Sequence, residues 1–272
     1  MSATWYGDAS PPDPTPISFL GWLRVIATGV PLAVLVFGGL LVLLLVRVIE
    51  APVFGARRPV TPYITVIVCR GALWLLGIKR RVFGPTASAA NCVVANHSSW
   101  LDIFVLNATG PVYFVSKAEV ASWPGIGWLA RGTGTMFVKR DRAKAAGQTE
   151  QFLKRLEAGH KLLFFPEGTS SDGLRVLPFK STLFAAFASP GSQNTLSIQP
   201  VTVVYSAPCH RDARFFGWWG DMDFGGHLLQ VLAHGRGGRA TMVQHAALRA
   251  RDYPDRKALA RACEERVRAG RA

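Results

Sequence analysis

The chain contains little acidic charge and little cysteine. Its 272 residues include 17 aspartates and glutamates against 31 lysines and arginines, so the formal net charge is +14. The four cysteines show no C-x-x-C spacing and no evident pairing scheme, and we interpret them as reduced thiols of a protein that faces the cytosol. Outside one motif described below, the histidines have no acidic or cysteine partners at metal-ligand spacing, so no metal is expected.

Charge of either sign is scarce overall, because only 18% of the residues are charged whereas 49% are hydrophobic. A positive mean hydropathy of +0.21 together with the basic excess suits a protein that meets both the apolar interior and the anionic headgroups of a membrane. A basic nucleic-acid binder is the alternative, but the sequence has no recognisable nucleic-acid motif. The length allows one sizeable domain and an appendage.

The N-terminal region predicts a membrane attachment. Residues 1–16 are rich in Pro, Ser, Thr and Asp, have no hydrophobic period and are expected to be mobile. Residues 25–46 contain no charged side chain, and as a helix they would reach about 33 Å, which is enough to span a bilayer. A cleaved signal peptide is not expected, because a basic start and a small-residue cleavage site are missing.

A second apolar stretch, residues 63–78, is interrupted by Arg70 and followed by a basic trio at 79–81. Its uninterrupted parts are too short to cross a bilayer, so it is expected to lie in the interface or to return beside the first helix as a shallow hairpin. If the first helix spans, the cations that follow it predict a downstream domain on the cytoplasmic side of the inner membrane. The alternative for residues 17–82 is a buried helical hairpin of a soluble protein.

Residues 83–272 are expected to form one α/β domain with a basic C-terminal tail. Short β-rich runs alternate there with helix-compatible stretches, which is typical of a sheet flanked by helices. In such folds the loops that leave the strand ends collect the working side chains. The predicted strands are residues 91–95, 112–115, 135–138, 161–165 and 197–205; the predicted helices are residues 103–108, 143–158 and 180–188, with another inside 249–271.

One chemically distinctive segment, Asn-His-Ser-Ser-Trp-Leu-Asp at residues 96–102, follows a predicted strand. On a continuous helix His97 and Asp102 would lie about 140° apart, so they serve one site only if His97 lies in the turn and Asp102 in the helix after it. In that geometry Asp102 holds one imidazole nitrogen and leaves the other to take a proton from a hydroxyl. A structural histidine is the alternative for this motif taken alone.

A second segment, Phe-Pro-Glu-Gly-Thr-Ser at residues 165–170, places a carboxylate and a glycine turn directly after a buried strand pattern. Main-chain N–H groups of such a turn can bind a phosphate or the oxyanion of a tetrahedral intermediate. An ordinary surface turn, and a pairing of Glu167 with an arginine, are the alternatives. A third segment, residues 134–140, ends in Lys139 and Arg140, which are typical phosphate ligands; a solvated strand end is its alternative.

Taken in their order along the chain, the segments resemble the motifs of the glycerolipid acyltransferase family, which includes 1-acylglycerol-3-phosphate acyltransferases. The family's H-x-x-x-x-D motif is similar to residues 97–102, its glycine, phenylalanine and arginine motif to 134–140, its F-P-E-G-T motif to 165–169, and a proline within an apolar strand to 198–201. The resemblance covers roughly residues 85–205. It implies a mixed β-sheet flanked by helices, with an N-terminal membrane-associated helical hairpin.

The resemblance also implies a mechanism. The histidine deprotonates the hydroxyl of a lysophospholipid, and the alkoxide attacks a fatty acyl thioester of coenzyme A or acyl carrier protein, with no metal, no other cofactor and no covalent enzyme intermediate. Anionic membrane lipids are expected partners, and nucleic acids are not. The catalytic roles fall on His97, Asp102, Lys117 and Gly168, the last two as oxyanion donors, and the headgroup contacts on Lys139, Arg140, Glu167, Gly168 and Thr169.

The leading functional prediction is a membrane-bound O-acyltransferase that converts lysophosphatidate to phosphatidate. Ser170 stands where an arginine often closes the family's F-P-E-G-T-R motif, which weakens the case for a phosphate monoester. The aromatic segment, residues 214–224, resembles a segment of bacterial relatives that acylate lyso-ornithine lipid, the alternative acceptor; an aromatic patch on the bilayer or core is its structural alternative. An inactive membrane-binding scaffold is the alternative of another class. The thioester carrier, acyl-chain length and oligomeric state stay open.

Overall fold

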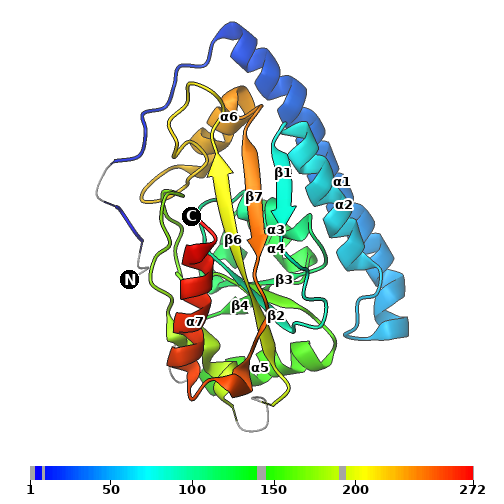
Figure 1. Ribbon diagram of the computed structural model, residues 1–272. Coiled ribbons are helices and arrows are strands. Elements are labelled where there is room, and N and C mark those ends of the chain that lie inside the picture. Colours follow the sequence, from blue (N-terminus) through cyan, green and yellow to red (C-terminus); the bar gives the residue numbers. More distant parts are fainter. Residues whose placement is uncertain (1–3, 8–9, 140–144, 190–193, 272) are drawn as a thin grey trace.

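The computed structural model describes residues 4–7, 10–139, 145–189 and 194–271 of the chain. A mixed sheet forms its centre (Figure 1), with the strand order β1-β7-β6-β2-β5-β3-β4 and with β8 paired to β6. Neighbouring strands are parallel except where β6 meets β7 and β8. The strands are β1 (Lys79–Phe83), β2 (Cys92–Ala95), β3 (Tyr113–Lys117), β4 (Met136–Val138), β5 (Leu162–Phe164), β6 (Ser197–Ser206), β7 (Arg239–Gln244) and β8 (Leu248–Arg249).

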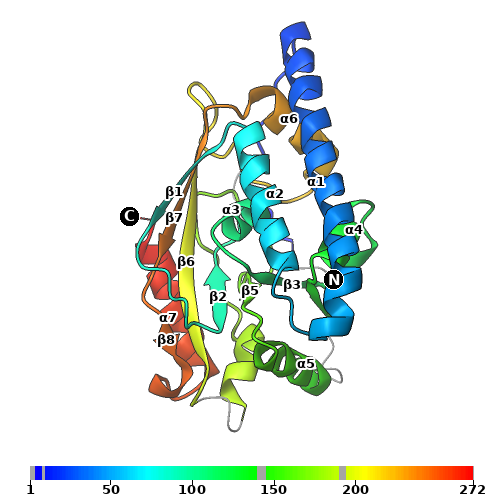
Figure 2. The same ribbon diagram turned by 90° about the vertical axis from the view of Figure 1, so that its right-hand side faces the viewer.

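Helices cover both faces of the sheet (Figure 2), so the predicted mixed sheet flanked by helices is confirmed. In β2, Val93 and Ala95 belong to a core shared with α2 and α3, whereas Cys92 and Val94 belong to a core shared with α5 and α7. Successive strand residues point to opposite faces, so a strand buried on both needs a continuous apolar run. The helical elements are α1 (Phe19–Phe54), α2 (Thr61–Leu75), α3 (Asp102–Asn107), η1 (Ala118–Ser122), α4 (Ile126–Gly132), α5 (Ala145–Glu157), η3 (Ser181–Ala188), α6 (Phe224–His234), η4 (Ala250–Asp252) and α7 (Arg256–Ala269).

The predicted apolar run is the middle of one long helix, α1. The Ser18 hydroxyl accepts a hydrogen bond from the Gly21 N–H at its start, and Gly55, with φ +58°, ends it. Its length and hydropathy make α1 a candidate membrane span. Only 11% of its 18-residue apolar window is buried inside the protein. Most of that window therefore faces away from the rest of the protein.

Contacts with the rest of the protein nevertheless extend along most of α1. Near its start Gly29 lies against α6, and in the middle Gly39 packs closely on α2. Near its end the buried Glu50 carboxylate accepts hydrogen bonds from the Thr61 main-chain N–H and hydroxyl. As Figure 2 shows, α2 returns beside α1, which is the arrangement that the hairpin interpretation predicts.

The second helix and the strand after it share their core with the main sheet. Ala72, Leu73 and Ile78 are buried in one cluster with residues of β2 and β6, and β1 is paired to β7. The boundary predicted between residues 82 and 83 therefore falls inside β1. This strand is missing from the predicted strands, because it begins with three basic residues. As an edge strand, β1 has largely exposed side chains, which can carry charge.

Other helical segments also differ from the sequence expectations. The predicted helix at 180–188 is the 3₁₀-helix η3, and its buried Phe184 and Phe187 are three positions apart, which fits three residues per turn. α6 lies outside the predicted helices, because Gly225 and Gly226 in its first turn lower helix propensity. α7 lies within residues 249–271 as expected, on the face of the sheet opposite α1 (Figures 1 and 2).

The described part of residues 1–16, a segment expected to be mobile, packs on the aromatic segment. The Gly220 N–H donates to the Trp5 carbonyl at 3.2 Å, and the Tyr6 hydroxyl donates to Asp221 at 3.2 Å. Trp5 also lies against Trp219, with ring centroids 6.5 Å apart. The Pro- and Ser-rich composition of the segment predicts mobility, but its two aromatic residues make specific contacts.

Candidate active site

The sequence motifs meet at one edge of the sheet. Strands β2, β5, β3 and β4 run parallel, so their carboxyl ends share that edge. The loop after β2 is fixed by Asn96, whose Oδ1 accepts from the Val203 N–H of β6 at 2.7 Å and whose Nδ2 donates to the Val203 carbonyl at 2.8 Å. His97 follows directly, so its main chain starts from a fixed position.

His97 lies in the turn and Asp102 is the first residue of α3, the geometry that their spacing requires for a shared site. The His97 Nδ1 is 2.8 Å from the Asp102 Oδ2. The imidazole is 20% exposed, whereas the carboxylate is fully buried. Because Asp102 occupies Nδ1, the Nε2 nitrogen is the one that can exchange a proton with a ligand.

Asp102 is held by three further donors. The Ser98 and Ser99 N–H groups donate to Oδ2 at 2.8 and 3.0 Å, and the Tyr205 hydroxyl donates to Oδ1 at 2.7 Å. Burial raises the pKa of Tyr205 well above its ordinary value, and the charge of Asp102 raises it further, so the phenol keeps the proton that it donates. Sequence reasoning missed Tyr205, which stands among other polar residues of β6 and has no distinguishing signal in the sequence.

Glu167 links the two principal motifs. Its side chain is 1% exposed; Oε1 accepts from the His97 N–H at 2.9 Å, and Oε2 accepts from the Leu177 N–H at 3.0 Å. Burial raises the pKa of Glu167 to about 8, and these two hydrogen bonds act in the opposite direction. The contact of Glu167 with the acceptor headgroup stays a prediction; in the structure both of its oxygens accept from main-chain N–H groups, because the loop after β5 folds against the loop after β2.

The turn after β5 also supports the imidazole ring. Phe165 stacks on His97 with centroids 4.0 Å apart and planes 12° apart. Gly168, with φ +70°, donates its N–H to the Phe165 carbonyl at 3.1 Å. The oxyanion role of this N–H stays a prediction; in the structure the same N–H closes the turn. The Thr169 hydroxyl donates to the adjacent Ser170 carbonyl at 3.4 Å.

Lys117 and Lys139 lie along the same sheet edge. Lys117 is the last residue of β3, and Lys139 directly follows β4 and is exposed. Arg140 lies outside the described residues. Hydrogen bonds thus join His97, Asp102 and Glu167, whereas Lys117 and Lys139 are placed by the ends of neighbouring strands.

The aromatic segment covers the loop after β2. The Trp218 N–H donates to the Ser98 carbonyl at 2.8 Å, and the Trp100 indole N–H donates to the His227 Nδ1 of α6 at 2.9 Å. Burial lowers the pKa of His227, so its ring is neutral and Nδ1 can accept. The sequence predicts a structural role for this histidine. In the structure its hydrogen bond to Trp100 holds α6 against the loop that carries His97.

This arrangement is suited to general-base chemistry. A partly exposed imidazole has its tautomer and ring plane fixed by a buried carboxylate and a stacked phenylalanine. A base positioned in this way contributes roughly 10²- to 10⁴-fold to a rate. Within the part of the chain that the structure describes, no group of three His, Cys, Asp or Glu side chains is placed to hold a metal ion.

Comparison with known proteins identifies the family to which the chain is similar. Residues 85–204 match the family model described as Acyltransferase. The chain is 52% identical over 266 residues, 98% of this chain and 96% of the relative, to a lyso-ornithine lipid O-acyltransferase of Rhodobacter capsulatus. It is 37% identical over 127 residues, 46% of this chain and 50% of the relative, to a 1-acyl-sn-glycerol-3-phosphate acyltransferase of Neisseria gonorrhoeae.

The fold has a counterpart among solved structures. It is similar to the crystal structure of the 1-acyl-sn-glycerophosphate acyltransferase PlsC from Thermotoga maritima, with a TM-score of 0.64 and 20% identity, over 92% of this chain and 94% of that chain. The fold is therefore shared even where the sequences have diverged. Together with 52% identity across nearly the full length of a relative, these matches mean that the chain belongs to the acyltransferase family and is an acyltransferase.

Proposed function

We propose that the protein transfers a fatty acyl group from a thioester to the hydroxyl of a lyso-ornithine lipid. The Rhodobacter capsulatus relative, which carries that activity in its name, matches 98% of the chain. The match to the 1-acyl-sn-glycerol-3-phosphate acyltransferase covers 46%. The proposal therefore prefers lyso-ornithine lipid, which the sequence prediction gave as the alternative, to lysophosphatidate, which it gave first.

The observation that carries the proposal is the position of the aromatic segment. Its Trp218 N–H is bonded to the carbonyl of Ser98, the neighbour of His97. Its Gly217 lies so close to the Asp172 carbonyl that a Cβ atom would meet it at 2.7 Å. The segment that resembles lyso-ornithine-specific relatives therefore contacts the two loops beside which the acceptor hydroxyl must bind.

The charges near this site also favour the ornithine headgroup, which carries a carboxylate and an ammonium and no phosphate. Ser170 replaces the arginine of the family pattern, and close by Asp172 is paired to Arg175 at 3.2 Å. Charges of both signs suit a zwitterionic headgroup, whereas a phosphate monoester is best bound by cations.

In the proposed mechanism the His97 Nε2 takes the proton from the acceptor hydroxyl while the hydroxyl oxygen attacks the thioester carbonyl carbon. The tetrahedral intermediate then breaks its C–S bond, and the departing thiolate receives the proton from Nε2. Asp102 stabilises the imidazolium between these two steps. Lys117 stays the predicted oxyanion partner, and Glu167 acts by positioning the main chain of His97.

The test is thiol release from acyl-coenzyme A by the purified protein in mixed micelles, with lyso-ornithine lipid and lysophosphatidate offered separately. The expected result is rapid release with lyso-ornithine lipid, an ester product of the matching mass, and no turnover by the His97→Ala variant. Acyl carrier protein as donor repeats the assay with the other thioester. Turnover with lysophosphatidate alone would overturn the proposal.

Lysophosphatidate is the second candidate acceptor. The Neisseria relative supports it, as does the sequence pair Lys139 and Arg140 after β4, which is suited to phosphate. Equal turnover of the two acceptors would identify an enzyme of broad headgroup tolerance.

The protein associates with a membrane, and we propose that α1 and α2 lie in one leaflet rather than crossing the bilayer. Docking along its whole length keeps α1 beside the main domain, whereas its outward face is apolar, with Phe19, Ile26, Val34 and Leu45 all exposed. We propose the cytoplasmic leaflet of the inner membrane, because the cations that follow α1 would be attracted to its anionic headgroups. Protease protection in sealed inverted vesicles tests this: residues on both sides of α1 should be cleaved from the same side.

A further inference from the structure

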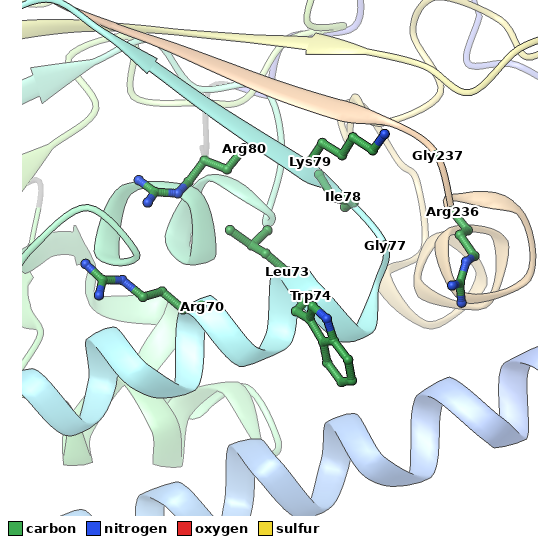
Figure 3. Close-up of a pocket in the computed structure, with 9 residues that line it drawn as sticks. All are labelled: Arg70, Leu73, Trp74, Gly77, Ile78, Lys79, Arg80, Arg236 and Gly237. Atoms are coloured by element: carbon green, nitrogen blue, oxygen red, sulfur yellow. The ribbon is translucent and has the colours of Figure 1, made fainter.

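A cavity lies away from the catalytic pair, between α2, the start of β1 and the turn that follows α6 (Figure 3). Its volume is about 540 Å³, and its wall contains Arg70, Lys79, Arg80 and Arg236 together with Trp74. Among the described residues, no acidic side chain lines it. Arg236 and Trp74 also line an adjoining hollow of about 310 Å³ that reaches Arg24 of α1.

The cations of this cavity lack acidic partners within the described chain. The Arg70 Nε donates to the Ala108 carbonyl at 2.8 Å, and the Arg80 Nη1 donates to the Thr109 hydroxyl at 3.0 Å, so both guanidinium groups are anchored by neutral oxygens. Burial lowers the pKa of Arg80, and the nearby charge of Arg70 lowers it further. An anion between these groups would relieve their mutual repulsion, and guanidinium forks match phosphate oxygens well.

The cavity opens at the edge of the apolar surface. Trp74 is 79% exposed, and on the same helix Ile67 is 66% exposed. Tryptophan beside basic residues is typical of the headgroup level of a bilayer. The catalytic pair is separated from it by α3, because Arg70 binds the C-terminal end of that helix while Asp102 is its first residue.

We propose that this cavity binds the phosphate of an anionic phospholipid of the host leaflet. A lipid headgroup is favoured over a soluble phosphate because the cavity adjoins the exposed apolar faces of α1 and α2, where the acyl chains of the same lipid would lie. Such binding would fix the depth and rotation of the enzyme at the membrane. The proposal goes beyond the acyl-transfer reaction and does not depend on which lysolipid is the acceptor.

The experiment compares three full-length proteins for cosedimentation with vesicles of phosphatidylcholine alone and of phosphatidylcholine mixed with phosphatidylglycerol. One is unaltered, one carries Arg80→Gln and Arg236→Gln, and the matched control carries Lys257→Gln and Arg261→Gln. The control removes the same charge from exposed residues of α7, on the other face of the sheet.

Each lost charge should weaken vesicle binding by about 1 kcal/mol, which is a factor of roughly five in affinity. The cavity variant lacks two charges, so the extra affinity for vesicles with phosphatidylglycerol should fall about 25-fold. The control should lose little, because its charges lie on the face turned away from the lipid. Equal losses in the two variants would overturn the proposal in favour of diffuse attraction. If the double variant fails to fold, Arg236→Gln alone should lose about fivefold.

A competition arm separates the two sources of phosphate. Inorganic phosphate or coenzyme A, added at the concentration of lipid phosphate, should leave vesicle binding unchanged. Displacement by either would assign the cavity to a soluble phosphate and overturn the lipid proposal. Because the readout is binding rather than turnover, failure here leaves the acyltransferase proposal intact.

Discussion

Replacing Asp102 by Asn isolates the charge of the catalytic pair from its geometry. The amide is nearly isosteric, and its oxygen can take the place of Oδ2, which accepts from His97, Ser98 and Ser99. Its NH₂ group would then face the Tyr205 oxygen, which can turn its hydroxyl away and accept, since a hydroxyl is both donor and acceptor. The ring plane and tautomer of His97 should therefore survive, and only the negative charge is lost.

The size of the effect follows from the distance. Nδ1 and Oδ2 are 2.8 Å apart, so the centres of the two charges are separated by about 4 Å, and at an effective dielectric constant of about 20 their attraction is about 4 kcal/mol. That attraction exists only once His97 has become an imidazolium, so its loss raises the barrier and lowers kcat by about 10³-fold. The KM values should change little, because the neutral ground state is unaffected.

The assay is the initial rate of thiol release in mixed micelles, with thermal unfolding measured on the same preparation. Asp252→Asn is the control, because it removes one negative charge from an exposed ion pair with Arg251 and should leave kcat unchanged. A folded Asp102→Asn protein with kcat within tenfold of the unaltered enzyme would refute the reasoning. A similar loss in the control would do the same.

Further expectations concern stability and positioning. Tyr205→Phe leaves the buried Asp102 Oδ1 without its donor, so the free energy of unfolding should fall by about 1–3 kcal/mol and kcat should fall with KM unchanged; unchanged kcat would limit Tyr205 to a structural role. The Glu167 pKa is about 8 in the folded protein against an ordinary value of 4.5, so between these values the folded state binds a proton that the unfolded state lacks. The free energy of unfolding should therefore fall as pH rises from about 5 to about 8, by at most about 1.4 kcal/mol per pH unit. The same slope in Glu167→Gln would contradict this. Gly39→Leu should lower the unfolding temperature in detergent because a Cβ there meets Val68, whereas Gly38→Leu, with open space at its Cβ, should not.

The parts of the site that could be predicted from the sequence are local ones. His97 and Asp102 lie five positions apart within a strand–turn–helix pattern, so the length of the turn sets their distance. The mixed sheet follows from the alternation of short apolar runs with helical stretches together with the family resemblance. Both predictions depend on residues that are close in sequence or on periodicity, which a single chain displays.

The long-range parts could not be predicted. Tyr205 reaches Asp102 because β6 pairs with β2 in one register, and no local pattern specifies that register. The motif identified Glu167 and Gly168 by residue type but did not reveal that the turn folds inward, which buries the carboxylate and engages the N–H. For α1, hydropathy measured its apolar length but not the elements that pack beside it.

The register of β2 and β5 also bears on how the chain can change during evolution. Val94 lies opposite Phe164, and His97 and Glu167 each follow these positions by the same number of residues, which is why one can bond the other. Insertions or deletions between α3 and β5, where β3, η1, α4, β4 and α5 lie, leave this correspondence intact. A one-residue deletion between Phe164 and Glu167 would instead displace the carboxylate by about 3.3 Å. The bond between His97 and Glu167 is thus independent of the lengths of the intervening elements, which can change without disturbing it.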